Sequence, residues 1–232
     1  MNPYKKVSAM KILVACEYSG RVREAFVKLG HTAMSCDFLP TDIPGDHYQG
    51  NVLDVLDQEW DLMIAHPDCT YLCSSGLHWN GRGKVVDGRP RAELTEEALD
   101  FVGKLLDAPI PRIALENPVG CLGTRIRKAD QYIQPHQYGH DTSKKTGLWL
   151  KNLPKLRPTL HVKPRWVCCG QPLSDISTCP TCHGKSKARP RWGNQTNSGQ
   201  NNLAPSEDRW KERARTYQGW ADAFANQWGG VA

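Results

Sequence analysis

The chain has 232 residues with 39% apolar and 23% charged side chains, enough for one well-buried domain with a small appendage. Its apolar runs reach only about five residues, so we expect no membrane span and no secretory leader, and a cytoplasmic location. Nine cysteines in such a chain are more typical of metal ligands, catalytic thiols or core positions than of disulfides.

The first half of the chain alternates apolar runs with segments of helical spacing. The expected elements, in chain order, are a strand at 11–16, a helix at 21–29, strands at 31–36 and 61–66, a helix at 92–108 and strands at 111–116 and 146–150. This alternation predicts an α/β fold with a Rossmann-like, doubly wound, mostly parallel sheet. Ligands bind at the carboxyl ends of the strands in such folds, so the polar residues there should converge.

Two segments depart from this alternation. Residues 79–91 are rich in glycine and basic side chains without periodicity, which predicts a mobile loop. Residues 153–205 are rich in Pro, Gly, Asn and Cys and are expected to form a small irregular insertion. Residues 207–228 return to helical spacing, with an interruption expected near Gly219. The domain division is therefore 1–152 with 206–232, and the insertion 153–205.

Basic residues concentrate in and before this insertion. Segment 144–191 carries eleven Lys or Arg and one acid, Asp175, although the net charge of the whole chain is only +6. A basic region on an otherwise acidic body is typical of a nucleic-acid-binding surface. A solvated, lysine-rich loop region is the alternative.

Two short segments carry the candidate chemistry. Cys69 stands two residues after Pro67 at the mouth of the predicted sheet, where a thiolate can be exposed and backbone amides can lower its pKa. Glu116 ends a later strand, in the sequence Leu-Glu-Asn-Pro-Val-Gly, and should lie near Cys69 if the fold is right. Cys69 alone could be a structural cysteine, and the Glu-Asn-Pro segment alone could be a turn that ends a strand. The two segments together are more specific evidence for an active site than either one.

This pair resembles motifs IV (Pro-Cys) and VI (Glu-Asn-Val) of the DNA cytosine-5 methyltransferases, most closely the short phage-type members. Segment 14–26 is similar to the family's motif I, with Gly20 at the glycine that contacts the methionine part of the cofactor. Asp37 stands where an acid binds the ribose hydroxyls, and Asn51 lies in the segment that meets the adenine. Segment 143–149 takes the place of the Gln-x-Arg-x-Arg strand, and 217–228 that of the last motif.

The resemblance implies a class I methyltransferase that uses S-adenosylmethionine. The Cys69 thiolate would add to carbon 6 of cytosine, while Glu116 donates a hydrogen bond or proton at ring nitrogen 3 and carbon 5 takes the methyl group. Glu116 must hold a proton at that step, so we expect burial to raise its pKa. Asn117 would hold the loop, and Lys144 or Lys145 would lie near the base or its phosphate. The implied cofactor-binding residues are Cys16, Glu17, Ser19, Gly20, Asp37, Asn51, His66 and Pro67.

The implied partner is DNA, in a bacterial or phage-infected host cell, with no obligate protein partner. A base within a duplex must be flipped out, or presented single-stranded, before a thiol can reach it. Loop 79–91 follows the nucleophile and is expected to close over the DNA, a disordered surface loop being the alternative. The expected DNA contacts are Arg82, Lys84, Arg89 and Arg91 in this loop, and Arg165, Lys187, Arg189 and Arg191 in the insertion.

The insertion also contains a candidate metal site. Its potential ligands are Cys168, Cys169, Cys179, Cys182 and His183. Zinc needs four ligands in tetrahedral array, and we expect Cys168 or Cys169, or both, with Cys179 and Cys182 and with His183 as the contested fourth. A zinc ion would order a segment that has no core of its own, whereas reduced surface thiols are the alternative.

Two other functions stay open at this stage. The short recognition region allows the same chemistry on single-stranded DNA, RNA or a free cytosine nucleotide. Asp68, which separates Pro67 from Cys69, and the single glycine of the motif I loop suggest instead a non-catalytic, zinc-dependent nucleic-acid-binding module. Cofactor binding separates this last function from the two enzymes.

Overall fold

The computed structural model describes residues 8–173, 179–183 and 186–230, and its centre is a seven-stranded sheet. The strand order is β3-β2-β1-β4-β7-β9-β8, in which the first five strands are parallel and β9 and β8 each run antiparallel to the preceding neighbour. The strands are β1 (Lys11–Ala15), β2 (Thr32–Asp37), β3 (His47–Gln49), β4 (Leu62–Ala65), β7 (Ile113–Pro118), β8 (Gln131–Ile133) and β9 (Thr146–Lys151). The predicted mostly parallel α/β sheet is confirmed.

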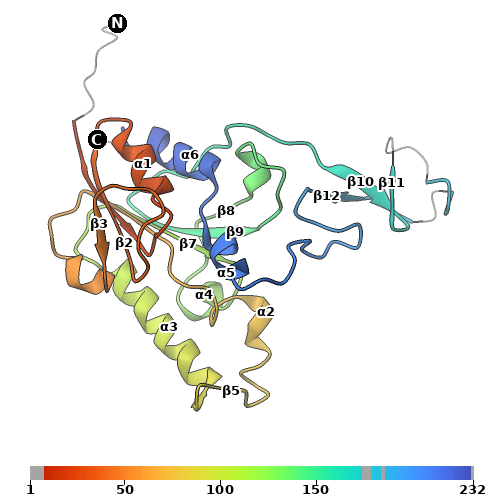
Figure 1. Ribbon diagram of the computed structural model, residues 1–232, viewed down its shortest axis with the longest axis horizontal. Coiled ribbons are helices and arrows are strands. Elements are labelled where there is room, and N and C mark those ends of the chain that lie inside the picture. The colour runs from red at the N-terminus through yellow and green to blue at the C-terminus, as the bar shows by residue number, and fades with distance from the viewer. Residues whose placement is uncertain (1–7, 174–178, 184–185, 231–232) are drawn as a thin grey trace, which may run out of the picture.

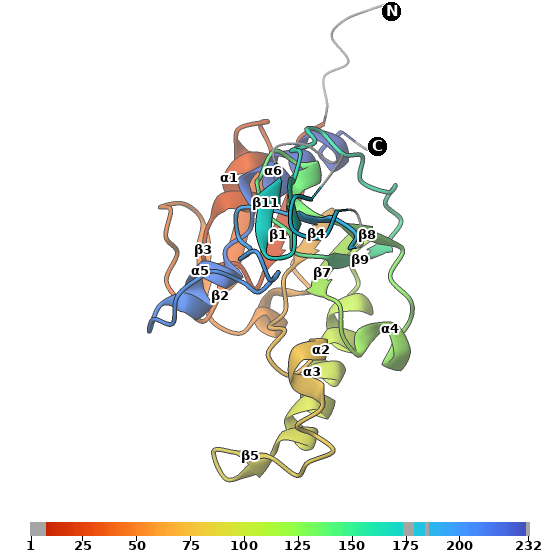
Figure 2. The same cartoon turned by 90° about the vertical axis from the view of Figure 1, so that its right-hand side faces the viewer.

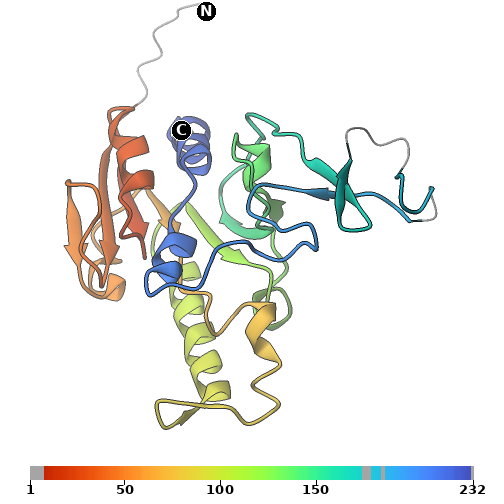
Figure 3. The same cartoon turned by 45° about the vertical axis from the view of Figure 1, so that its right-hand side comes forward.

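Helices cover both faces of this sheet because its central strands are apolar on both sides. Ile12 and Val14 of β1 pack into one cluster with α1 (Arg21–Val27) and α6 (Gln218–Trp228), whereas Leu13 and Ala15 face α3 (Arg91–Leu106). Figure 3 shows α1 and α6 on one side of the sheet and α3 on the other. Trp220, Phe224 and Trp228 of α6 are fully buried, so the last helix packs back on the sheet.

The segment predicted as a mobile loop instead contains a small hairpin. After the short helix α2 (Ser74–Leu77), strands β5 (Val85–Val86) and β6 (Arg89–Pro90) pair antiparallel. The hairpin lies at the amino-terminal end of α3 (Figure 2). Asp87 and Gly88 form its two-residue turn, with φ of 48° and 79°. Asp-Gly is the residue pair that tolerates two positive φ angles in such a turn, so the sequence held a hairpin signal that periodicity does not detect.

The carboxy-terminal helix is interrupted three residues earlier than expected. Helix α5 (Arg209–Ala214) ends before residues 215–217, and Gly219 lies inside the first turn of α6. A Cβ at Gly219 would come within 1.8 Å of the Tyr138 carbonyl oxygen. This glycine therefore marks a close backbone approach and does not break the helix.

The insertion carries its own three-stranded antiparallel sheet, which lies apart from the main sheet in Figure 1. Its strands are β10 (Arg165–Cys168), β11 (Gln171–Leu173) and β12 (Arg189–Arg191). Cys169 and Gly170, both with positive φ, turn the chain between β10 and β11. The remaining short elements are η1 (Val52–Val55), α4 (Leu122–Arg125) and η2 (Pro135–Gln137). Nowhere in the described ranges is a helix both long and apolar enough to cross a membrane.

Candidate active site and metal centre

Side chains from the carboxyl ends of β1, β2, β4 and β7 line one cavity of about 910 Å³. This volume is within the range of sites that enclose a cofactor-sized ligand. The predicted site residues that line it are Cys16, Glu17, Ser19, Asp37, His66, Pro67, Cys69, Glu116, Lys144 and Lys145. Three other predicted residues, Gly20, Asn51 and Asn117, lie outside its lining.

Cys69 and Glu116 reach this cavity from adjacent strands. Cys69 lies half-buried in the loop after β4, and Glu116 is a residue of β7 with only 7% of its surface exposed. Strands β4 and β7 are parallel neighbours in register, so the segments that leave their carboxyl ends start side by side. The sheet therefore brings a thiol and a carboxyl group to the same cavity.

Backbone contacts tie the loop that carries Cys69 to the loop that follows Glu116. The side-chain amide of Asn117 donates from Nδ2 to the Pro67 carbonyl oxygen over 2.9 Å. Farther along, the backbones of Cys73 and Gly120 form an isolated β-bridge, and a Cβ at Gly120 would come within 1.9 Å of the Leu72 carbonyl oxygen. The two loops thus form one packed unit around the cavity.

A second thiol, which the sequence analysis did not single out, lies beside Cys69. The Cys73 amide donates to the Cys69 carbonyl oxygen over 3.0 Å, so one helical turn separates two residues that both line the cavity. The Cys69 thiol donates a hydrogen bond to the Cys73 sulfur, which lowers the pKa of Cys73 to about 5 and, together with burial, raises the pKa of Cys69. The Ser75 hydroxyl, 3.1 Å from the Cys73 sulfur, contributes to the lowered pKa. The negative charge of the pair therefore resides on Cys73, and the Cys-x₃-Cys spacing was the signal for it.

The electrostatics of Glu116 differ from the prediction. Burial, the largest single influence, raises its pKa as expected, but the Lys144 ammonium and the hydrogen bond with His66 outweigh burial, so the pKa lies below its ordinary value. The expected rise is wrong for the protein without substrate because it considered burial and left out the two neighbours. Glu116 is therefore a carboxylate before substrate binds.

His66, which was predicted to contact the cofactor, lies against this carboxylate. Its Nδ1 atom is 3.4 Å from Glu116 Oε2, and the two side chains are 8% and 10% exposed. Neither His66 Nε2 nor Glu116 Oε1 has a hydrogen-bond partner within the described part of the chain, although both atoms are buried. The pair is therefore buried and only half satisfied.

The other end of the cavity is formed by β1 and β2. Asp37 closes β2, and its Oδ1 accepts a hydrogen bond from the Leu39 amide over 3.0 Å. Phe38 is 73% exposed and also lines the cavity, a position that the sequence did not indicate. Cys16, at the end of β1, has a φ of 58°, a left-handed conformation that is uncommon for a residue with a side chain. A carboxylate, an aromatic ring and a sharp turn thus meet here.

Several predicted cofactor residues make contacts within the protein. The Glu17 carboxylate accepts from the Val22 amide over 2.8 Å and from the Ser19 hydroxyl over 2.9 Å, so it caps the first turn of α1. The Asn51 side chain accepts from the Leu53 amide and caps η1. Gly20, with a φ of 70°, packs against the side chain of Arg23. These residues shape the loops next to the cavity.

The basic residues of the hairpin segment have unequal access to a partner. Arg82 and Lys84 both lie over the Trp79 ring, 5.4 and 5.2 Å from its centroid, at the exposed surface. Arg89 forms an ion pair with Glu97. Arg91 is 95% buried and donates to the Thr70 carbonyl oxygen over 2.6 Å. The expectation that Arg91 contacts DNA is therefore wrong, because its guanidinium is used to hold the loop after β4 on α3.

In the insertion, two arginines are used internally and two basic residues project outward. Arg165 donates to the Trp192 carbonyl oxygen over 2.8 Å, and Arg191 donates to the carbonyl oxygens of residues 190, 197 and 198. Lys187 and Arg189 are exposed. The exposed pair is therefore better placed for a nucleic-acid contact than the two arginines that organise the fold.

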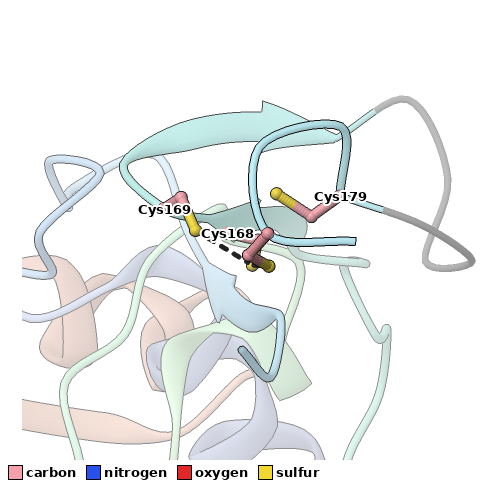
Figure 4. A group of neighbouring side chains, drawn as sticks. Cys168, Cys169 and Cys179 are labelled. Carbon is pink, nitrogen blue, oxygen red and sulfur yellow. Dashed lines mark hydrogen bonds between the residues drawn. The ribbon is translucent and has the colours of Figure 1, made fainter. Parts of the chain in front are cut away.

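Four cysteines of the insertion gather at the end of its small sheet (Figure 4). The sulfur atoms of Cys168, Cys169, Cys179 and Cys182 all lie within 4.8 Å of one another. Cys168 Sγ is 3.9 Å from Cys169 Sγ and 3.6 Å from Cys182 Sγ, close to the edge of about 3.8 Å for a tetrahedron with zinc–sulfur bonds near 2.3 Å. The Ser186 amide donates to Cys182 Sγ over 3.4 Å. His183 is not a member of this group, so the four thiols could bind a metal ion without it.

Comparison of the chain with known protein families and with curated proteins finds no match. Its function therefore has to be inferred from the chemistry of the cavity and of the cysteine cluster.

Proposed function

We propose that this protein transfers a methyl group from S-adenosylmethionine to carbon 5 of cytosine in DNA. The observation that carries this proposal is the meeting of Cys69 and Glu116 in one cavity at the carboxyl edge of a mostly parallel sheet. A thiol nucleophile and a carboxyl acid are the two groups that the resemblance to the cytosine-5 methyltransferases requires. The Rossmann-like sheet supports the class I fold that the same resemblance implies.

The cavity also suits the proposed cofactor. Asp37 offers a carboxylate at the end of β2, where ribose hydroxyls are bound in many Rossmann-like folds, and Phe38, Leu39 and Val52 supply apolar walls beside it. S-adenosylmethionine would supply an electrophilic methyl group when it is bound. The residues of this chain would hold its ribose at Asp37 and leave the cytosine between Cys69 and Glu116.

Each residue then has a defined task in the reaction. The Cys69 sulfur forms a bond to carbon 6 while its proton passes to the neighbouring Cys73 sulfur, and negative charge develops on the ring. Glu116 hydrogen-bonds or protonates ring nitrogen 3, which makes carbon 5 reactive toward the methyl group. Lys144 lies close enough to lower the pKa of both Cys69 and Glu116, so it stabilises negative charge at either group. The carbon 5 proton is then lost to solvent water as the double bond between carbons 5 and 6 re-forms, and the Cys69 sulfur leaves and takes back its proton from Cys73.

We further propose that the four-cysteine cluster binds Zn²⁺ and that the insertion contacts DNA. The distances between its sulfur atoms fit tetrahedral zinc, and a metal would hold together a module that lacks a core of its own. Exposed Lys187 and Arg189 supply positive charge for the phosphate backbone. Arg82 and Lys84, also exposed, supply positive charge on the hairpin segment.

A covalent trap tests the enzymatic proposal directly. With 5-fluorocytosine in a duplex and S-adenosylmethionine present, the fluorine cannot leave as a proton would, so the bond to Cys69 should persist and appear as a mass shift on its peptide. Cys69→Ser should form no adduct, whereas the matched variant Cys73→Ser should still form one at Cys69, more slowly. An adduct at Cys73, or no adduct with either the wild type or Cys73→Ser, would refute Cys69 as the nucleophile. The same assay with a single strand and with dCMP identifies the substrate.

A further inference from the structure

His66 lies against Glu116, and the reaction described above gives this histidine no task. The parallel register of β4 and β7 pairs Ala65 with Leu115. The residues that come next in the sequence, His66 and Glu116, therefore lie side by side. Their side chains meet at 3.4 Å, between His66 Nδ1 and Glu116 Oε2, and both are at least nine-tenths buried. A histidine held against the acid of the site is in a position to exchange a proton with it.

The surroundings of the pair contain few other ionisable groups. Lys144, from the segment before β9, acts on Glu116 through its charge, and Thr146 of β9 also helps to lower the pKa of Glu116. The Glu116 charge in turn acts on Tyr217, just before α6. Phe224 of α6 covers the imidazole, with ring centroids 6.4 Å apart. Burial and the Glu116 charge both raise the pKa of Tyr217, so that phenol stays protonated and neutral. In the described part of the chain, Lys144 and His66 are therefore the two candidates to supply a proton to Glu116.

Acid catalysis at ring nitrogen 3 needs a proton that Glu116, as a carboxylate, does not hold before substrate binds. We propose that His66 stores this proton and passes it to Glu116 when cytosine is attacked; the inference rests on the proposed function. Histidine is the side chain that exchanges protons near neutral pH, whereas a lysine ammonium releases its proton only far above it. In the transfer, the N–H bond at Nδ1 of the His66 imidazolium breaks as an O–H bond forms on Glu116, and the ring becomes neutral and keeps its proton on Nε2. That O–H bond then breaks as an N–H bond forms at ring nitrogen 3, and elimination of Cys69 reverses both steps.

The unsatisfied carboxylate oxygen of the pair also has a place in the proposed reaction. Glu116 Oε1, buried and without a partner in the described chain, is left to accept a hydrogen bond from the 4-amino group of cytosine. Thymine and uracil lack that amino group, so the same geometry selects cytosine.

Nitrogen NMR of the histidine rings tests the pair in the free protein, without any substrate. The proposal requires protons on both ring nitrogens of His66, and Glu116→Gln should change the nitrogen signals of His66 because the variant removes an adjacent anion. His161→Gln, at an exposed histidine, is the control and should leave the His66 signals unchanged. A His66 ring with a proton on only one nitrogen, or one whose nitrogen signals do not respond to Glu116→Gln, would overturn the proposal.

The pH dependence of methyl transfer tests the same pair during turnover. The wild-type rate should fall as pH rises and the pair loses its shared proton, and His66→Gln should abolish this fall and lower the rate by roughly 10²-fold or more, as loss of a proton donor does. His161→Gln should retain the wild-type profile. A His66→Gln enzyme with the wild-type pH profile and rate would refute the role of His66 and leave the proposed function in place. A wild-type protein that methylates none of the cytosine substrates would refute the proposed function, while the NMR result would still stand for the pair.

Discussion

Single side chains in the cavity have very different acidities although they line the same space. Burial is the main reason that the pKa of Cys36 rises to about 12, and nearby Asp37 adds to the effect. Cys73 has the opposite shift, to about 5, because its sulfur accepts hydrogen bonds from the Cys69 thiol and from Ser75. Burial therefore keeps Cys36 protonated, whereas local hydrogen bonds favour ionisation of Cys73.

This difference predicts the order in which thiols react. A thiol with a lowered pKa is ionised above that pKa and is protonated as pH falls through it, so Cys73 should be alkylated by iodoacetamide at a nearly constant rate above about pH 6. Cys36 should stay unmodified over the same range. Cys69→Ala removes the hydrogen bond to Cys73, so the pKa of Cys73 should rise and its alkylation rate at about pH 6 should fall. Peptide mapping by mass spectrometry measures all three, and preferential labelling of Cys69 in the wild type would contradict the assignment.

At the scale of elements, the sequence predicted the strands that are buried on both faces and missed those that are not. Continuous apolar runs ended by polar residues identified β1, β2, β4 and β7, because a central parallel strand has no polar face. Strands β3 and β8 are three residues long and partly exposed, so they have no pattern to detect. The hairpin β5–β6 depends on the φ angles of Asp87 and Gly88, which is turn chemistry and not periodicity.

The candidate site could be predicted only as far as its motifs. Cys69 and Glu116 were identified by the two motifs, but the pairing of His66 with Glu116 follows from the adjacency of β4 and β7, which the linear sequence does not state. Arg91 looked like a surface cation because its neighbours are polar. The structure buries it, because its guanidinium satisfies backbone and side-chain acceptors in the segment after β4. Long-range contacts were the missing information in both cases.

The contact between the two loops that follow β4 and β7 leads to a prediction, for which Gly123 in α4 offers a matched control. Gly120→Ala places a methyl group 1.9 Å from the Leu72 carbonyl oxygen, so the loops must move apart. We expect a lower melting temperature and a larger loss of methyl transfer than of stability. Gly123→Ala, three residues later in α4, meets no atom within 4 Å and should stabilise the protein by roughly 0.5–1 kcal/mol. Thermal unfolding and initial rates measure both, and equal effects of the two variants would contradict the packed unit.

At the scale of the whole molecule, the insertion contacts the segment that leads into the cavity wall. Asn194 makes two hydrogen bonds with the Ser143 backbone, accepting from its amide and donating to its carbonyl oxygen, each over 2.9 Å. The Trp192 ring stacks on His136 with centroids 4.3 Å apart. Because Lys144 follows Ser143 and lines the cavity, the position of the insertion and that of the Lys144 backbone are mechanically linked.

This link predicts that methyl transfer depends on the metal even though the four cysteines lie outside the cavity. Elemental analysis should find one zinc per chain, and its removal by a chelator should lower the rate together with the order of the insertion. Asn194→Ala should lower the rate by about tenfold, which corresponds to roughly 1.4 kcal/mol, while the zinc stays bound. Asn197→Ala loses one hydrogen bond within the insertion, to the Gly170 carbonyl oxygen, and should keep the wild-type rate. A metal-free protein that folds and methylates at the wild-type rate would show that the insertion serves DNA contact alone, since the Lys144 segment would then keep its place without it.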